Sequence, residues 1–164
     1  MSRTRETIVI EAKPPQSTAR IAGRPIHPMT VSIPITLLIA TFFCDLVYYL
    51  AEVTALATVA LYTLGLGIVF AALAGVFGFI DYFGSARIRS LRAAHIHMIG
   101  NTVILLLSIV NFIVRYGSTE PVPVTSFILS TIAFVAIHVT GWMGWTMVYR
   151  HGVGMSGHLP ADRR

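Results

Sequence analysis

Residues 24–50 read RPIHPMTVSIPITLLIATFFCDLVYYL, and this stretch decides what kind of protein the chain forms. From Met29 onward it is an apolar run with the length of one membrane-spanning helix. His27 lies between two prolines at the start of the run, and Asp45 lies well inside it. A charged side chain in hydrocarbon is energetically costly, so we expect Asp45 and His27 to face protein, water or a partner group rather than lipid.

The composition of the whole chain agrees with this stretch. Hydrophobic residues make up 55% of the 164 residues, charged residues only 12%, and the mean hydropathy is +0.74, as in integral membrane proteins. Four runs are long enough to cross a hydrocarbon core of about 30 Å as helices. They lie at Met29 to Ala51, Ala55 to Phe83, Ala93 to Tyr116 and Thr125 to Tyr149. The predicted fold is all-α, an integral membrane four-helix bundle in up-down-up-down order.

The chain divides into three predicted parts: a flexible basic N-terminal arm (1–24), a four-helix transmembrane domain (25–152) and a short C-terminal tail (153–164). The first 25 residues are polar and basic and lack the apolar core of a cleavable signal peptide. Cys44 is the single cysteine, which excludes an intrachain disulfide and any multi-cysteine metal site within this chain. We expect Cys44 to be a small apolar filler.

The basic residues predict the orientation of the four spans. The arm, the loop between the second and third spans, and the tail would share one side of the membrane. That side carries Arg3, Arg5, Lys13, Arg20, Arg24, Arg87, Arg89, Arg92, Arg150, Arg163 and Arg164, whereas the other side carries Arg115 alone. By the positive-inside rule, both termini are predicted to be cytoplasmic. Anionic lipid headgroups account for the basic charge, so no nucleic-acid partner is expected.

Small residues and prolines shape the first two spans. Gly67, Ala71 and Gly75 repeat every four residues, a spacing that lets membrane helices approach closely, and we expect this face to pack against a neighbour. Pro34 removes a backbone donor and predicts a kink or opening in the first span.

Polar residues of the four spans are predicted to meet near the cytoplasmic surface. With alternating spans, His27, Asp81, His95 and His151 lie at one depth, one from each helix, as in bundles that hold cofactors or metals. Because His95 and His97 are about 200° apart on a helix, only one of them faces inward, and we expect it to be His95, on the flank of Asn101. His97 would then face the headgroups or the second span.

Three chemistries remain open for this cluster. Two imidazoles on different helices ligate haem iron axially. Two or three imidazoles with a carboxylate, here His27, His95, His151 and Asp81, bind a transition metal. Histidines and carboxylates without a metal relay protons, and Asp45 and His138 would extend such a path through the membrane. His138 also fits a simple hydrogen-bonding role between helices.

Several of these residues occur in motifs of a known family. The segments are RPIHP at 24–28, GFIDY at 78–82, Ala94-His95, Asn101, GWMG at 141–144 and YRHGVG at 149–154. They resemble an uncharacterised bacterial family of four-span membrane proteins, a domain of unknown function whose opening pattern is HPxHP. Arg24 replaces the first histidine of that pattern, which weakens the case for a site that needs both histidines. His97 and His138 lie outside the pattern.

The resemblance implies redox work in the membrane, because some relatives are fused to Rieske-type iron–sulfur or sugar-dehydrogenase modules. Our first hypothesis is a small, cytochrome b-like electron-transfer protein. It would bind haem b, or otherwise a metal, through two of His27, His95 and His151 and exchange electrons with quinone or a redox partner protein.

Two other classes of function fit the sequence. The chain could be a non-catalytic scaffold subunit of a larger membrane complex or homo-oligomer, with its histidines only hydrogen-bonded. It could also be a proton or metal-ion carrier that uses Asp45 and Asp81. In every case membrane lipids are partners.

Overall fold

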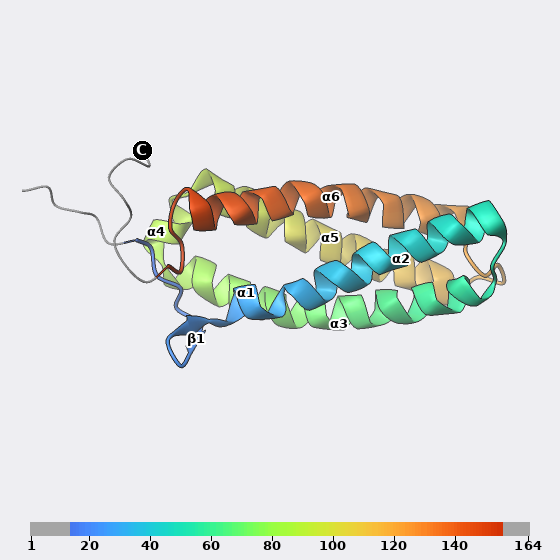
Figure 1. Ribbon diagram of the computed structural model, residues 1–164, viewed down its shortest axis with the longest axis horizontal. Helices are drawn as coiled ribbons and strands as arrows, with labels where there is room; N and C mark the ends of the chain where they lie inside the picture. Colours follow the sequence, from blue (N-terminus) through green and yellow to red (C-terminus); the bar gives the residue numbers. More distant parts are fainter. Residues whose placement is uncertain (1–13, 156–164) are drawn as a thin grey trace, which may run out of the picture.

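The computed structural model describes residues 14–155, and within them the chain is a bundle of long helices (Figure 1). The helices are α1 (Ile26–Thr30), α2 (Ser32–Ala51), α3 (Ala55–Gly84), α4 (Ala86–Arg89), α5 (Arg92–Tyr116) and α6 (Val124–Tyr149). The strands β1 (Arg20–Ile21) and β2 (Arg24–Pro25) form a small antiparallel hairpin before α1. The predicted all-α fold with four helices that could span a membrane is confirmed.

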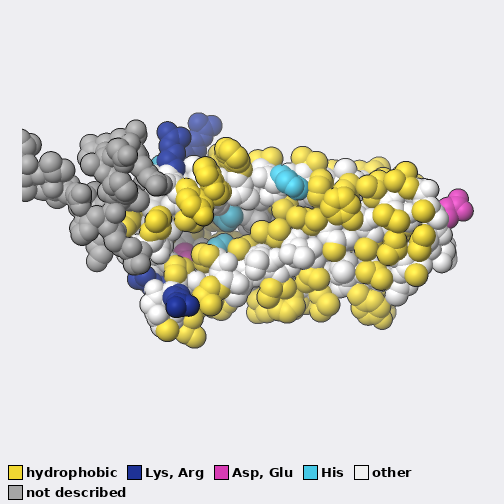
Figure 2. Space-filling view, in the orientation of Figure 1, with side chains coloured by type: hydrophobic (Ala, Val, Ile, Leu, Met, Phe, Trp, Pro, Cys, Tyr) yellow, Lys and Arg dark blue, Asp and Glu magenta, His cyan; other side chains and the backbone are white. Residues whose placement is uncertain are grey.

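The long helices match the predicted spans closely. In the described part of the chain, four segments are long and apolar enough to cross a membrane: Ile26–Ala51, Ala55–Gly84, Arg92–Tyr116 and Val124–Tyr149. Large apolar side chains such as Leu50, Tyr62 and Ile113 are exposed on their surfaces. Figure 2 shows this apolar coat along the bundle, with basic side chains gathered at one end. These exposed apolar side chains are suited to contact lipid in a membrane.

The hydrogen bonding of the first span is irregular just before Pro34. Helix α1 ends at Thr30 and α2 begins at Ser32, while Val31 between them keeps helical backbone angles. Pro34 has no N–H to donate to the carbonyl of Thr30, four residues earlier. The Thr30 hydroxyl donates to the carbonyls of Ile26 and His27 in its own helix, at 3.2 and 3.1 Å. The short helix α1 carries His27.

The four spans close into a ring of neighbours. Contacts join α2 to α3, α3 to α5, α5 to α6 and α6 to α2, so that α2 lies opposite α5 and α3 lies opposite α6. The central apolar cluster consists of Leu38, Leu64, Ile104, Ala133 and Ile137. A Cβ placed on Gly67 would lie 2.9 Å from Leu38, so this glycine permits the close contact between α2 and α3 that its sequence spacing predicted.

We name the two ends of the bundle by their polar residues. At the histidine end, α1 and α5 begin and α3 and α6 end, and Asp81 and His27 lie there. At the Asp45 end, α2 and α5 end and α3 and α6 begin.

The segment before α1 is held against the histidine end, whereas the sequence analysis assigned it to a flexible arm. Asp81 accepts hydrogen bonds from the backbone N–H groups of Thr18 and Ala19, both at 2.7 Å, and from the Ser17 hydroxyl. The Gly154 N–H donates to the carbonyl of Pro15 at 2.9 Å. A carboxylate near a membrane boundary needs donors, and this segment supplies them. Residues 1–13 of the predicted arm and 156–164 of the predicted tail lie outside the described residues.

Candidate cofactor site

A cavity of about 370 Å³ lies at the histidine end and is lined by residues of all four spans. Its volume is within the range of small-molecule and cofactor sites. Figure 2 shows a hollow on this part of the surface with histidine side chains inside it. The lining is mainly apolar or small, and its members include Pro34, Leu38, Ala71, Gly75, Gly78, Met98, Ile104, Gly141 and Gly144.

Two histidines face this cavity from opposite helices. His27, on α1, and His97, on α5, both line it, and their ring centres lie 5.9 Å apart with the planes at 88°. His27 Nδ1 lies 2.9 Å from the carbonyl oxygen of Ala74, and His97 Nδ1 lies 2.9 Å from that of Thr140. Because a carbonyl oxygen only accepts, each Nδ1 carries a proton, and in the neutral imidazole each Nε2 then keeps a lone pair. Neither Nε2 has a hydrogen-bond partner among residues 14–155.

The surroundings of the two histidines repeat the same pattern. Ala74 begins the segment AGVFG on α3, and Thr140 begins TGWMG on α6. A Cβ on Gly78 would lie 3.2 Å from the His27 ring, and one on Gly144 would lie 3.1 Å from the His97 ring. The glycine of each segment that follows Ala74 or Thr140 faces open space, since its Cβ would have no neighbour within 4 Å. Gly78 and Gly144 therefore let the two rings lie close to the helix backbones. Gly75 and Gly141 leave open space along the helices.

His95 does not face the cavity, contrary to the prediction from the sequence. The prediction that His95 faces inward is wrong, because its side chain is exposed and its Nδ1 bonds the carbonyl of Leu91 in its own helix at 3.0 Å. The inward residue is His97. The preceding Ala94 is buried against Tyr82 and Ile88, and this packing turns His95 outward, with its ring 5.5 Å from that of Tyr82.

A spacing in the sequence identifies His97 as inward-facing. His97, Asn101, Ile104, Ser108, Asn111 and Arg115 follow one another at intervals of four and three residues. Such intervals mark one face of a helix. The last four of these residues are buried, and Asn101 donates to the carbonyl of His97 at 2.7 Å and lines the cavity.

The four residues predicted to bind a metal together do not come together. Asp81 borders the cavity but accepts its hydrogen bonds from the segment before α1. His151 is half-buried in the turn after α6 and is not among the lining residues. Within residues 14–155, no three side chains of His, Cys, Asp or Glu are placed to share a metal ion.

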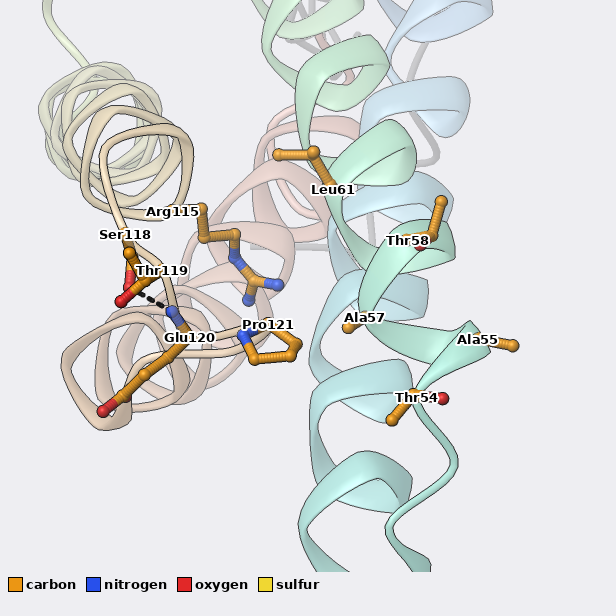
Figure 3. Close-up of a pocket in the computed structure, with 10 residues that line it drawn as sticks. All are labelled: Thr54, Ala55, Ala57, Thr58, Leu61, Arg115, Ser118, Thr119, Glu120 and Pro121. Atoms are coloured by element: carbon orange, nitrogen blue, oxygen red, sulfur yellow. Dashed lines mark hydrogen bonds between the residues drawn. The ribbon is translucent and has the colours of Figure 1, made fainter.

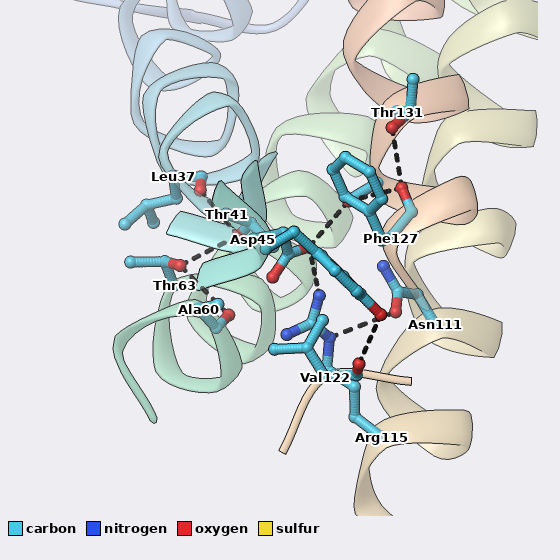
Figure 4. Close-up of polar contacts among 12 residues, drawn as sticks. Leu37, Thr41, Asp45, Ala60, Thr63, Asn111, Arg115, Val122, Phe127 and Thr131 are labelled. Carbon is cyan, nitrogen blue, oxygen red and sulfur yellow. Dashed lines mark hydrogen bonds and ion pairs between the residues drawn. The ribbon is translucent and has the colours of Figure 1, made fainter. Parts of the chain in front are cut away.

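His138 and Asp45, the other predicted polar residues of the spans, both form contacts outside the cavity. His138 is exposed, and its Nδ1 lies 2.8 Å from the carbonyl of Phe134 in the same helix, so it does not bond across helices. Asp45 is fully buried and faces protein, as predicted. Figure 4 shows its ion pair with Arg115 and the nearby Asn111. The Ser130 hydroxyl donates to the same Asp45 oxygen at 2.7 Å.

The Asp45 ion pair is not part of the cavity. His27 and Asp45 are 18 positions apart, which is roughly 27 Å along a helix. Sequence reasoning missed Arg115 as the partner because it counted this residue among the loop charges. The signal was present, since both residues lie near the ends of their spans at the same end of the bundle.

The fold and this cavity define a four-span helical membrane protein with two histidines aimed at an internal apolar space. The chain belongs to the family described as predicted membrane protein (DUF2231), whose model matches residues 23–157. The matched range contains both histidines and both glycine-containing segments. No curated protein and no solved structure matches the chain.

Proposed function

We propose that this protein is a small membrane electron-transfer protein that binds a b-type haem through His27 and His97. One observation carries the proposal: two imidazoles on opposite helices keep unpaired Nε2 atoms at one apolar cavity, and each is oriented by a backbone carbonyl. Metal-ligating histidines commonly donate their second ring N–H in this way, which fixes the tautomer and the ring orientation.

The spacing of the rings suits two ligands on one iron. The ring centres lie 5.9 Å apart, and His27 and His97 would together hold the iron through their Nε2 atoms. Gly75 and Gly141 leave open space along the cavity wall, as a flat ring system requires.

Haem explains the residues better than a bare metal ion. The porphyrin supplies four of the iron ligands, so the protein needs to supply only two histidines. A zinc site would need three or four protein ligands, and the described residues contain no such group. The arginines at the histidine end, such as Arg92 at the start of α5 and Arg150 at the end of α6, would offset the charge of the haem propionates.

A bound haem would supply one-electron chemistry, and the protein residues would hold it and determine its surroundings. His27 and His97 hold the group, Ala74 and Thr140 orient the two rings through their carbonyls, and the apolar lining excludes water. We place the site near the cytoplasmic face of a bacterial inner membrane, because the basic residues gather at this end. A quinone or a redox partner protein would exchange electrons with it.

The test is a reduced-minus-oxidised absorption spectrum of the detergent-purified protein, with metal analysis of the same sample. We expect a b-type spectrum that His27→Ala and His97→Ala each abolish. His95→Ala is the matched control, because this histidine lies two residues away on the same helix and faces outward. We expect it to leave the spectrum unchanged.

Two results would contradict the proposal. A b-type spectrum that survives both His27→Ala and His97→Ala would place the haem elsewhere. Wild-type protein without haem and without stoichiometric metal would exclude the electron-transfer role, and a scaffold subunit of a larger membrane complex would then account best for the chain.

A further inference from the structure

The two histidines of the cavity and the two residues of the buried ion pair are spaced identically along their helices. Asp45 follows His27 by 18 residues. Arg115 likewise follows His97 by 18 residues. Eighteen residues make about five helical turns, or roughly 27 Å, so each histidine and its ion-pair residue lie on the same side of their helix. The intervening segments are helical, since Val31 between α1 and α2 keeps helical backbone angles.

The buried faces of α2 and α5 also correspond position by position. The buried residues of α2 are Pro34, Leu38, Thr41 and Asp45, and those of α5 after its first turn are Ile104, Ser108, Asn111 and Arg115. Each member of the second set lies 70 positions after one of the first, as His97 lies 70 positions after His27. The two helices run in the same direction on opposite sides of the bundle. Their matched faces therefore have the histidines at one end and the ion pair at the other.

The apolar layers between these two pairs do not by themselves fix how far α2 lies along α5. They consist of the central cluster of Leu38, Leu64, Ile104, Ala133 and Ile137. Apolar side chains form no directional bonds, and no hydrophobic driving force holds helices together in a membrane. Such faces pack in more than one register, and in coiled coils a single polar position selects one of them.

The ion pair joins three of the four spans at one level. Asp45 on α2 bonds Arg115 on α5, and it accepts from the hydroxyl of Ser130 on α6 at 2.7 Å. Arg115 Nε also donates to Asn111 Oδ1, one turn earlier in α5, at 3.3 Å. Figure 3 shows the guanidinium projecting from the end of α5 toward the start of α3. A slip of one helical turn, about 5 Å, between α2 and α5 would break the ion pair.

Net stabilisation alone does not account for this pair. The side chains of Arg115 and Asp45 are 2% and 0% exposed, and Arg115 Nη1 and Asp45 Oδ1 have no hydrogen-bond partner within residues 14–155. Because buried charges lose their hydration, apolar side chains of similar volume often stabilise a fold equally well. The best attested role of such buried polar groups is to select one register among several.

We propose that the buried ion pair is a positioning device, which fixes the register of α2 against α5 and thereby holds His27 and His97 at one depth. The two ring centres lie 5.9 Å apart, and a slip of one turn would place the rings at different depths. The register is a property of the bundle, and only its effect on haem binding rests on the proposed function.

The register is measured as the distance between two nitroxide spin labels on the full-length protein in detergent, by double electron–electron resonance. Cys44→Ala first removes the single native cysteine. Val47→Cys in α2 and Ile99→Cys in α5 then place the labels at exposed positions toward opposite ends of the bundle. With the helices in matched register, these positions differ in depth by roughly 27 Å, so an axial slip changes the distance directly. Circular dichroism of the same samples measures the helical content.

Two double variants remove the ion pair and two preserve the register. Asp45→Leu, Arg115→Met introduces two apolar side chains, and Asp45→Asn, Arg115→Met removes the charges with the smallest change at position 45. Asp45→Glu, Arg115→Lys keeps opposite charges. Thr41→Val, Thr63→Val is the matched control, because it removes a hydroxyl contact of 2.9 Å between α2 and α3, which a short loop already connects.

We expect one unchanged distance in wild type, in Asp45→Glu, Arg115→Lys and in the threonine control. In the two variants that lack the ion pair, we expect the distance to shift or split by about 5 Å while the helical content is retained. Under the proposed function, these two variants also lose the b-type spectrum and the other variants keep it.

An unchanged distance in both variants that lack the ion pair overturns the proposal. Loss of helical structure in both also overturns it, because the pair would then serve stability alone. A shift of equal size in the threonine control has the same meaning, since loss of any polar contact would then move the helices. A shifted distance in a protein that binds no haem even as wild type supports the positioning role and rejects the haem site. A haem spectrum with unchanged distances in all variants rejects the positioning role and leaves the haem site supported.

Discussion

The two ends of the bundle both carry polar side chains from facing helices, but they satisfy them in different ways. At the Asp45 end, a donor meets an acceptor: Arg115 bonds Asp45, and Ser130 completes the carboxylate oxygen. At the histidine end, His27 Nε2 and His97 Nε2 are both acceptors and cannot satisfy each other. The first arrangement pairs opposite charges, with Asp45 Oδ1 and Arg115 Nη1 left without a partner in the described residues, whereas the second brings together two groups of the same kind. Under the proposed function, the first arrangement stabilises the fold and the second holds a ligand.

The largest effect is expected from breaking the ion pair between Asp45 and Arg115. Asp45→Ala leaves the Arg115 guanidinium buried without its counter-charge, and loss of one partner of a buried ion pair costs about 3–5 kcal/mol. Unfolding in detergent, followed by circular dichroism, measures this loss. The double variant Asp45→Ala, Arg115→Met should recover most of it, because no unpaired charge remains. A single variant as stable as wild type would show that water already solvates this pair.

A pair of glycine variants on α3 separates packing from cavity space. Gly67→Leu should destabilise the fold by about 1–3 kcal/mol, because a Cβ there meets Leu38 at 2.9 Å. Gly75→Leu meets no atom within 4 Å at its Cβ and should leave stability unchanged or raise it by up to about 1 kcal/mol.

The same two variants should have opposite effects on the cavity. Gly75→Leu fills space in the cavity that Gly75 lines and should abolish the haem spectrum while the protein stays folded. Gly67→Leu should retain the spectrum in its folded fraction, since Gly67 does not line the cavity. Haem retained in Gly75→Leu would contradict the placement of the porphyrin along this wall.

A smaller and local effect is expected at Asp81. Asp81→Asn keeps one oxygen but loses the charge that strengthens the hydrogen bonds from Thr18 and Ala19. We expect a loss of about 1–2 kcal/mol in the local stability of residues 14–25. Hydrogen exchange at the Ala19 amide measures it, with the α3 amides as an internal control. Unchanged protection at Ala19 would show that the neighbouring contacts hold the segment without Asp81.

The sequence alone predicted the membrane spans correctly but did not identify all residues of the candidate site. Hydropathy placed the span ends within a few residues because membrane thickness fixes the length of an apolar helix. The inward face of α5 was misassigned because a short local comparison favoured His95, whereas the face is set by the longer spacing from His97 to Arg115. The groups that orient His27 and His97 are backbone carbonyls of Ala74 and Thr140, which no side-chain pattern records.

The repeated glycine segments also divide the molecule. The hairpin of α1, α2 and α3 contains His27 together with the carbonyl that orients it, and the hairpin of α5 and α6 contains His97 together with its own carbonyl. Each half orients one imidazole ring through a carbonyl of its own, and neither half contains both histidines. The chain is thus built as two equivalent modules whose association, rather than either fold alone, creates the cavity.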